Sequence, residues 1–341
     1  MQKVFLKNND YWAKKLNIEG LKENQSITIL KKRYVLKKGI LRSKESFSKN
    51  QSKTKETFGY KWKQRRSYES EKMRDFVKKW LIEKYLAGNL KLLDKWLPER
   101  AAILDAGCGS GFSSLLLFGE KINNVEYLGV DISEAVDTAV VRFREKQIKG
   151  EFLQADLSDL PFSKPTFDLI FSEGVLHHTD NPEGSFKSLS KLIKRGGRFL
   201  FYVYRKKSPI REFADDYIRD YLRNFNDDDA WKKLMPITKL GKALGDLKAT
   251  VNIPEAIPYL GIPSGKTDVQ RLFYWHIFKV FYRENFSIQE MNHINFDWYR
   301  PLNCFRFSTT EVRNWCRKNK FSIERLHEEE AGISVVAQKR S

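Results

Sequence analysis

The stretch ILDAGCGSGFSS, residues 103–114, places an acid and three glycines directly after an apolar run. Asp105 ends that run, and the glycines follow at alternate positions, Gly107, Gly109 and Gly111. In a parallel sheet a ligand sits outside the carboxyl ends of the strands, and a glycine-rich turn lets the backbone approach it. A Cβ at such positions collides with the ligand or requires an unfavourable backbone angle. The stretch therefore predicts a strand, a ligand-binding turn and a helix.

The spacing of the glycines separates two classes of ligand. The dinucleotide fingerprint has glycines at its first, third and sixth positions, which brings a helix N-terminus to a pyrophosphate. Here the sixth position is Phe112, and Asp105 stands at the strand tip, where it would repel a diphosphate. A carboxylate at that place suits a cationic ligand instead.

Strand and helix patterns alternate on both sides of this turn, which is typical of a parallel sheet covered on both faces. A helix over 72–86 and a second over about 89–97 precede the turn, and a helix over 309–319 follows much later. Helices are also expected from about 111, over 133–147 and over 183–194. The expected strands are 101–106, 125–130, 151–155, 167–172, 198–204, 321–327 and 332–338.

Five segments in register resemble the class I S-adenosylmethionine-dependent methyltransferases. Order, spacing and residue identity agree with that family across residues 101–204. The matching segments are DAGCGSG at 105–111, VEYLGVD at 125–131, QADLSDLPF at 154–162, FDLIFSEGVLHHTDNP at 167–182 and KLIKRGGRFLFYVY at 191–204. The resemblance implies a Rossmann-like, seven-stranded, mostly parallel α/β sheet with an antiparallel last strand, sandwiched by helices.

The resemblance also implies the residues that bind S-adenosylmethionine. Asp131 stands where the family has an acid that binds both ribose hydroxyls, and a carboxylate has the two acceptor oxygens that a cis-diol needs. Asp156 and Leu157 stand where the family holds the adenine ring. The implied cofactor-binding residues are Asp105, Gly107, Cys108, Gly109, Gly111, Asp131, Ile132, Asp156, Leu157 and Ser172.

Several of these residues also have a structural interpretation. Asp105 could cap the following helix, and Cys108 could simply fill the turn. Asp131 could be an N-cap, although Ser133 fits that role better. Asp156 could be one of the acids that are common in loops.

The tandem His177 and His178 follow the fourth strand, close to where a methyl acceptor would enter. Histidine titrates near neutrality and could take the proton of the acceptor. Both are therefore candidate catalytic residues, although many members of the family carry histidine here without a role as a base. Asp168, at the start of its strand, is expected to be structural.

The chain divides into three parts on its sequence. Residues 1–66 form a basic N-terminal extension, in which the polar stretch 44–55 is interpreted as a mobile connection. Residues 67–207 and 301–341 form the methyltransferase domain. Residues 208–300 form a helical, aromatic-rich insertion, interpreted as a lid and acceptor-binding part.

The regions outside the motifs are similar to a bacterial subgroup of these enzymes that acts on small metabolites, lipids and sugar-containing compounds. The similar segments are FGYKW at 58–62, DWYRPLNCFRFSTTEVRNW at 297–315 and the terminal GISVVAQK. Members often carry a zinc-ribbon-like segment before the catalytic domain. This chain has no cysteine before Cys108, so RYVLKKGILRS at 33–43 is at most a degenerate remnant, and no metal is expected. Tyr60 and Trp62 are expected to fold over the cofactor.

The charge of the chain is unevenly distributed. Residues 1–72 hold 20 Lys and Arg against 7 Asp and Glu, and so carry +13 of the net charge of +19. Such a segment favours an anionic partner, for example nucleic acid, an anionic lipid or an acidic glycan, although it could equally be a solvated extension.

The cysteine content indicates a reducing compartment. The chain has three scattered cysteines, no apolar run long enough to cross a membrane, and an N-terminus, MQKVFLKNND, without the core of a signal peptide. We therefore expect a cytoplasmic protein.

Together these features predict an S-adenosylmethionine-dependent methyltransferase acting at oxygen or nitrogen of a small-molecule, lipid or glycan-linked acceptor. The alternatives are an RNA methyltransferase that uses the basic segment, and a catalytically silent cofactor-binding or scaffold protein. A carboxylated form of the cofactor also stays open, because many arginines could meet the added carboxylate.

Overall fold

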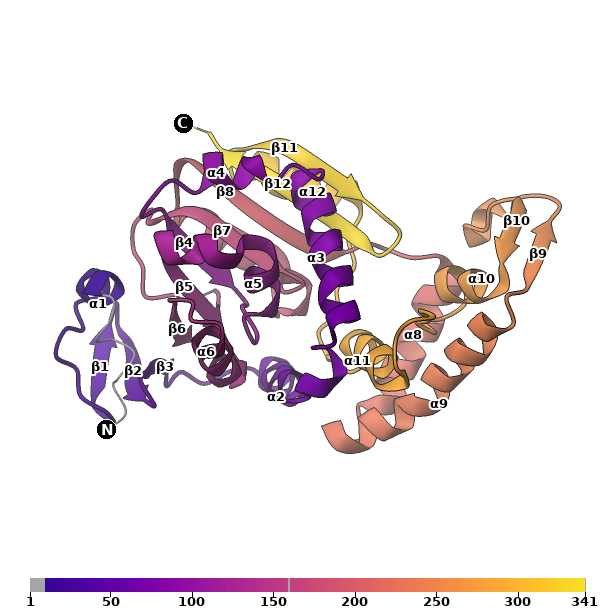
Figure 1. The fold of residues 1–341 in the computed structure, drawn as a ribbon, viewed down its shortest axis with the longest axis horizontal. Helices are drawn as coiled ribbons and strands as arrows, with labels where there is room; N and C mark the ends of the chain where they lie inside the picture. Colours follow the sequence, from indigo (N-terminus) through magenta and orange to yellow (C-terminus); the bar gives the residue numbers. More distant parts are fainter. Residues whose placement is uncertain (1–9, 159, 341) are drawn as a thin grey trace.

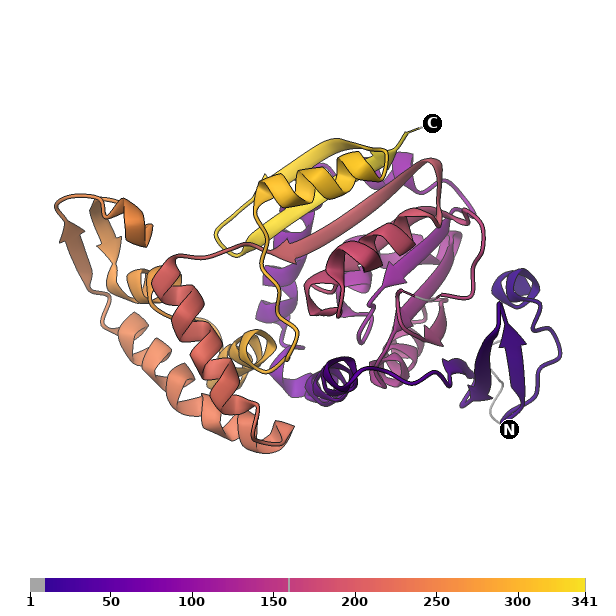
Figure 2. The same cartoon turned by 180° about the vertical axis from the view of Figure 1, so that it is seen from behind.

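The computed structural model describes residues 10–158 and 160–340. Figures 1 and 2 show a large sheet with helices on both faces, a small unit at the N-terminal end and a helical lobe at the opposite end. Residues 1–9, in which we looked for a signal peptide, lie outside the described residues together with residues 159 and 341.

The central part of the sheet has the predicted seven strands. Their order is β6-β5-β4-β7-β8-β12-β11, in which the first five are parallel and β12 is antiparallel to both of its neighbours. The antiparallel last strand is therefore confirmed. The bounds are β4 Ala102–Ala106, β5 Glu126–Asp131, β6 Glu151–Gln154, β7 Phe167–Glu173, β8 Ile193–Tyr204, β11 Phe321–Glu328 and β12 Gly332–Lys339.

The sheet has ten strands rather than the seven predicted, because the N-terminal segment extends it. Strands β1 (Ser26–Ile29), β2 (Lys32–Lys37) and β3 (Ile40–Ser43) form an antiparallel meander, and β3 pairs parallel with β6. This pairing covers the edge of β6, which would otherwise leave backbone groups unpaired. Residues 26–43 therefore belong to the sheet rather than to a separate extension.

Two hydrophobic clusters lie on the opposite faces of the sheet. Neighbouring residues of a strand point to opposite faces, so Leu104 lies in one cluster and Ile103 in the other. The first face carries α1 (Asp10–Leu16), α7 (Pro182–Ser190) and α12 (Thr309–Lys318), and the second carries α3 (Glu71–Leu86), α4 (Lys91–Trp96), α5 (Phe112–Phe118) and α6 (Ala135–Glu145).

The polar stretch that we interpreted as a mobile connection is mostly helical. Helix α2 spans Lys49–Lys63 and begins at Ser48, whose side chain accepts a hydrogen bond from Gln51 N at 3.0 Å. An N-cap of this kind satisfies one of the free amides of the first turn. Figure 1 shows α2 running from the N-terminal unit toward the helical lobe.

The insertion 208–300 is mainly helical, as predicted, with one β-hairpin. Its helices are α8 Pro209–Leu222, α9 Asp227–Asp246, α10 Val269–His276 and α11 Ile288–Tyr299, and its hairpin is β9 Thr250–Ile253 with β10 Gly265–Asp268. A capping box of Ser287 and Glu290 begins α11. This helix packs against α9, α8 and α2 and so connects the lobe to the sheet domain.

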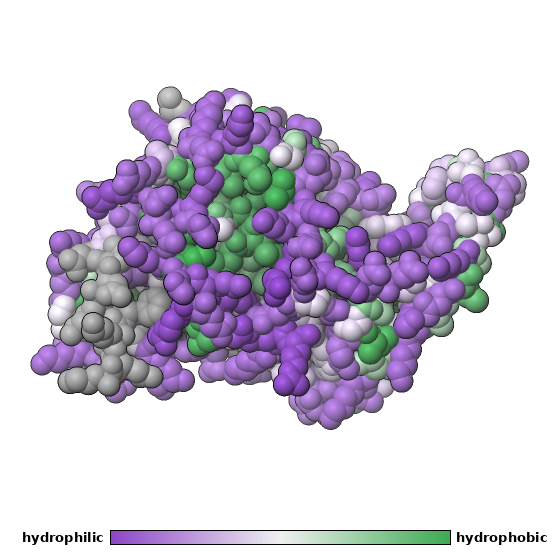
Figure 3. All heavy atoms as spheres, in the orientation of Figure 1, coloured by the Kyte–Doolittle hydropathy of each residue, from purple (hydrophilic) through white to green (hydrophobic). Residues whose placement is uncertain are grey.

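The face drawn in Figure 3 is mostly hydrophilic, and its apolar residues gather where α3, α4 and α5 lie. Leu90, just before α4, is 49% exposed. Over the described residues, no helix combines the length and the apolar character that crossing a membrane requires.

Candidate functional site

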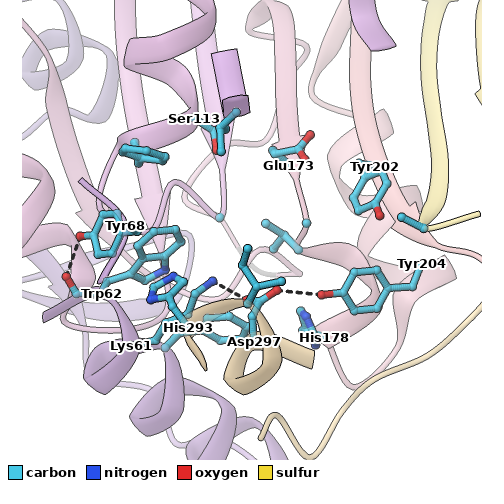
Figure 4. Close-up of a pocket in the computed structure, with 18 of the residues that line it drawn as sticks. Lys61, Trp62, Tyr68, Ser113, Glu173, His178, Tyr202, Tyr204, His293 and Asp297 are labelled. Atoms are coloured by element: carbon cyan, nitrogen blue, oxygen red, sulfur yellow. Dashed lines mark hydrogen bonds and ion pairs between the residues drawn. The ribbon is translucent and has the colours of Figure 1, made fainter. Parts of the chain in front are cut away.

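A cavity of about 480 Å³ lies at the carboxyl ends of the parallel strands, between the sheet, α2 and the insertion. This volume is within the usual range for a ligand pocket. Its wall includes residues that follow β4, β5, β6 and β7, namely Gly107, Asp131, Ile132, Asp156, Leu157, Gly174 and Val175. The rest of the lining comes mainly from α2, α3, α10 and α11, and Figure 4 shows part of it.

The glycine turn adopts a conformation that side chains would disrupt. Gly107, Gly109 and Gly111 all have positive φ, of 86°, 51° and 70°. A Cβ on Gly107 would overlap the side chain of Val175, and a Cβ on Gly109 would lie 2.6 Å from Trp62 Nε1. Only Gly107 lines the cavity, whereas Gly109 is covered by Trp62. The glycines thus serve close packing as well as access to the cavity.

Asp131 lies at the tip of β5 and faces the cavity. Its Oδ1 accepts hydrogen bonds from Ser133 N at 2.8 Å and Ser133 Oγ at 2.6 Å, and its Oδ2 accepts one from Gly109 N at 2.9 Å. A carboxylate has about four acceptor positions, so one remains for a ligand hydroxyl. Burial raises the pKa of Asp131, although these three donors act in the opposite direction.

Asp105 is buried behind the turn instead of lining the cavity. Its Oδ2 accepts hydrogen bonds from Tyr127 OH at 2.6 Å and from Ser114 Oγ on α5. Burial raises the pKa of Asp105 to about 7, although both hydrogen bonds lower it. The carboxyl group therefore ties β4 to β5 and α5, but it does not cap α5, whose N-cap Gly111 has no side-chain hydrogen bond.

Three other predicted cofactor residues pack beneath the cavity wall and do not line the cavity. Cys108 is buried in the hydrophobic cluster that contains Phe143, and Gly111 packs against that ring. Ser172 Oγ donates to Ala106 O at 2.9 Å and joins β7 to β4. Of the ten predicted residues, the structure brings together around the cavity Gly107, Asp131, Ile132, Asp156 and Leu157.

Asp156 and Leu157 follow β6 at the same end of the cavity as Asp131. Asp156 Oδ1 accepts from Ser158 N at 2.8 Å and Ser158 Oγ at 2.7 Å, which holds the loop in place. Leu157 is buried and offers an apolar surface. Asp168 lies away from the cavity and accepts from Ala102 N and Lys194 Nζ, both at 2.8 Å, so its expected structural role fits these contacts.

The two histidines have different environments. His178 lines the cavity, and its Nδ1 lies 2.6 Å from Asn303 O. Because a carbonyl oxygen only accepts, Nδ1 carries the proton and Nε2 carries a lone pair. This Nε2 is buried and has no hydrogen-bond partner among the described residues. Burial lowers the pKa of His178 to about 4, so the ring is neutral at pH 7.

His177 points into the protein. Its ring lies 3.7 Å from that of Tyr204 and is fully buried, outside the cavity wall. Burial lowers its pKa as well. Of the two candidate bases, only His178 reaches the space where an acceptor could sit. No cluster of three or more His, Cys, Asp or Glu side chains within residues 10–158 and 160–340 suits a metal ion.

Sequence reasoning missed a polar network in the cavity wall. Lys61 of α2 forms an ion pair with Asp297 of α11, and Tyr204 OH of β8 donates to the same carboxylate at 2.9 Å (Figure 4). Although burial alone would raise the pKa of Asp297, the charge of Lys61 lowers it below its ordinary value. A signal for this pair was present, because FGYKW and DWYRP contain Lys61 and Asp297.

The aromatic residues of FGYKW take separate positions. Trp62 lines the cavity, covers the glycine turn and packs edge-to-face on Tyr68 at 5.1 Å, whereas Tyr60 packs against Phe296 and Trp231 of the insertion, outside the wall. Only Trp62 therefore has the placement that we expected for a residue folding over the cofactor.

The sequence matches known proteins over the part of the chain that forms the sheet. Residues 104–201 match a family described as "Methyltransferase domain". Malonyl-[acyl-carrier protein] O-methyltransferase 2 of Ilyobacter polytropus is 28% identical over 162 residues, which are 46% of this chain and 61% of that protein. Phosphoethanolamine N-methyltransferase 1 of Triticum aestivum is 29% identical over 136 residues, 39% of this chain and 27% of that protein.

The tRNA U34 carboxymethyltransferase of Hydrogenovibrio crunogenus is 33% identical over 103 residues, 29% of this chain and 30% of that protein. The chain therefore spans less than two thirds of the length of these relatives, and the acceptors in their names differ. The solved structure of magnesium protoporphyrin IX methyltransferase from Synechocystis PCC 6803 is 15% identical, covers 86% of this chain and 99% of its own, and has a TM-score of 0.44.

The family assignment follows from where the sequence match falls in the fold. The matched residues 104–201 run from β4 through β5, β6 and β7 into β8, which are the five parallel strands whose ends form the cavity. Because the match coincides with the strands that build the site, residues 104–201 form a methyltransferase domain of the class I, S-adenosylmethionine-dependent type.

Proposed function

We propose that this protein transfers a methyl group from S-adenosylmethionine to an oxygen or nitrogen atom of a small-molecule, lipid or glycan-linked acceptor. The observation that carries the proposal is one continuous cavity that is lined by Gly107, Asp131 and Leu157 and also by His178 and residues of the insertion.

The residues at the sheet side fit the cofactor. Asp131 keeps one acceptor position for a ribose hydroxyl, Leu157 and Ile132 offer apolar surface for a base, and Gly107 leaves room beside Val175. When bound there, the cofactor supplies a sulfonium that already activates its methyl group. What remains for the protein is to align the acceptor and exclude water.

The residues at the opposite side can accept a proton and shield the site. His178 lines the cavity with a neutral ring whose Nε2 carries the lone pair, and we assign to this nitrogen the proton that the acceptor atom loses as its new bond to carbon forms. Trp62 and the aromatic side chains of the insertion line the cavity with apolar surface, which favours the exclusion of water once the ligands are bound. His178 therefore positions and deprotonates the acceptor in this proposal.

Binding of the cofactor tests the proposal. We expect calorimetry to show micromolar binding of S-adenosylmethionine and S-adenosylhomocysteine and none of NAD. Asp131→Ala is expected to weaken both by about tenfold or more, because it removes an acceptor for a hydroxyl in a buried site. Asp246→Ala, at an exposed aspartate outside the cavity wall, is the matched control and is expected to bind normally. Binding of NAD, or equal affinity of Asp131→Ala, would contradict the proposal.

Transfer of a labelled methyl group to a panel of acceptors then separates an enzyme from a silent binding protein. The basic N-terminal segment favours an alternative function, in which the methyl acceptor is RNA. However, Lys61, Lys63 and Arg65 in that segment pair with Asp297, Glu134 and Glu145 of the rest of the chain. Part of the positive charge of this segment is therefore paired with acids of the same chain. Salt-sensitive RNA binding would be the observation that favours the RNA alternative.

A further inference from the structure

Three cations of the insertion reach the cavity on the side away from Asp131. Lys279 follows α10 and is only 7% exposed, whereas Arg271 on α10 and Arg283 stand at the exposed rim. They lie on one wall because the chain turns back after α10, which brings residues 279–283 beside that helix. The cavity therefore has one buried cation with two more at its mouth.

None of these three side chains forms an ion pair with another described residue. Arg271 Nη2 donates only to Tyr282 O, at 3.4 Å, and the guanidinium of Arg283 lies 3.9 Å from the centre of the Phe76 ring. The ammonium of Lys279 lies 5.0 Å from the Trp298 ring. All three cations thus keep their capacity to bind an anion.

The acids in the same wall already have partners. Asp297 is held by Lys61 and Tyr204, and Glu173 by Lys84 and by Tyr85 OH at 2.5 Å. Glu329 accepts from Trp80 Nε1 at 2.8 Å. Asp131 and Asp156 stand at the other side of the cavity. Trp80 is a neutral donor and leaves the charge of Glu329 uncompensated, so the insertion side has three unpaired cations against one unpaired acid and its balance is positive.

A buried ammonium without a counter-ion is costly. Burial and the neighbouring Arg211 lower the pKa of Lys279 to about 7, although Asp297 raises it. Burial and the charge of Arg271 lower the pKa of Arg283. A bound anion would relieve both effects, because it supplies the charge that the wall lacks.

The surface around these cations is aromatic. Tyr274, Trp275 and Phe281 from the insertion line the cavity together with Phe76 and Trp80 from α3. Aromatic walls of this kind bind flat or apolar groups through large contact areas. The surroundings of the cations therefore favour an apolar body beside the anion.

We propose that the methyl acceptor carries a carboxylate or phosphate group on an aromatic or other apolar body, and that Lys279, Arg271 and Arg283 bind its anion. This inference rests on the proposed methyltransferase function and names the class of its acceptor. Carboxylate and phosphate share the chemistry that the cations recognise, and the experiment separates them.

The test measures binding of matched probes by calorimetry to the full-length protein saturated with S-adenosylhomocysteine. One pair is 4-hydroxybenzoate with 4-hydroxybenzamide, and the other is phenyl phosphate with phenol. We expect the anion of at least one pair to bind roughly ten- to a hundred-fold more tightly than its neutral partner, the range for a charged hydrogen bond. The pair with the larger ratio identifies carboxylate or phosphate.

Substitutions then locate the effect. Lys279→Met, which keeps the length and apolar character of the side chain, is expected to abolish most of the discrimination, and Lys279→Arg to retain it. Arg283→Gln, at the exposed rim, is expected to reduce it by several-fold without affecting the fold. Lys242→Met, whose lysine is exposed and paired with Asp246, is the matched control.

The outcomes are distinct. Equal affinity within both pairs, or no binding of any probe at millimolar concentration, would overturn the inference while leaving the proposed function intact. Weaker S-adenosylhomocysteine binding in Lys279→Met would assign the cations to the cofactor and also overturn it. Failure of the wild-type protein to bind S-adenosylhomocysteine would instead refute the proposed function.

Discussion

Replacing Lys61 with methionine would break the ion pair that joins α2 to the insertion in the wall of the cavity. Lys61 and Asp297 are 236 positions apart in the sequence, and their side chains are 8% and 27% exposed. The variant leaves the carboxylate of Asp297 with Tyr204 OH as its remaining donor from the network. The stability of the whole protein should therefore report on a contact that sequence reasoning missed.

The expected cost follows from the burial of the pair. Removing one partner of a fully buried pair costs about 3–5 kcal/mol. Because Asp297 keeps partial exposure, we expect the free energy of unfolding to fall by about 2 kcal/mol at pH 7. The pKa of Asp297 lies below its ordinary value of 3.8, so the pair stabilises the wild-type protein above about pH 4 and loses this effect below it.

Denaturant unfolding followed by tryptophan fluorescence is the assay. Lys63→Met is the matched control, because Lys63 is on the same helix and its pair with Glu134 is 61% exposed on both sides. We expect that control to lose less than about 0.5 kcal/mol. The double variant Lys61→Met with Asp297→Asn should recover most of the loss, since no buried charge then remains unpaired.

Two results would contradict this contribution of the ion pair. One is a loss of unfolding free energy in Lys61→Met no larger than in Lys63→Met, and the other is a double variant no more stable than Lys61→Met alone. The first result would mean that the pair is solvated in solution. The second would mean that Lys61 stabilises α2 by packing rather than by charge.

Two further predictions concern the turn and the candidate base. Gly109→Ala places a methyl group 2.6 Å from Trp62 Nε1 at a φ of 51°, and we expect calorimetry to show a loss of S-adenosylhomocysteine affinity of about tenfold or more. Gly119→Ala, with a φ of 55° and nothing within 4 Å, controls for backbone strain, and an equal effect of both would rule out the clash with Trp62. His178→Gln should slow labelled-methyl transfer by about 10²-fold or more with cofactor binding unchanged. Because the pKa of His178 is about 4, the wild-type rate should show no loss from this group until the pH falls toward 4, and a loss near the ordinary 6.5 would contradict its burial.

Local sequence patterns were sufficient to predict the central strands and the helices between them. The glycines after β4 and the alternation of apolar strands and helices predicted the central seven strands and the side of the sheet where the cavity lies. The strands β1, β2 and β3 were missed. They join the sheet only through the pairing of β3 with β6, a strand far along the sequence, and no local pattern reveals this pairing.

The residues of the candidate site were likewise only partly predictable from the sequence. Motif spacing placed Gly107, Asp131 and Leu157 around one cavity, but it could not distinguish them from Asp105 and Ser172, which the fold turns away from it. Residues of one motif alternate between the two faces of a strand or the two sides of a turn, so adjacency in sequence does not decide which side chain meets a ligand.

The sequence by itself predicted the alternation of strands and helices and the end of the sheet at which the cavity forms, because glycine geometry and hydrophobic periodicity are local properties of the chain. Only the tertiary structure brought Lys61, Asp297 and Lys279 to the cavity, since these residues come from α2, α11 and the segment after α10. Long-range packing decides which distant side chains share a wall, and with them the charge that an acceptor meets.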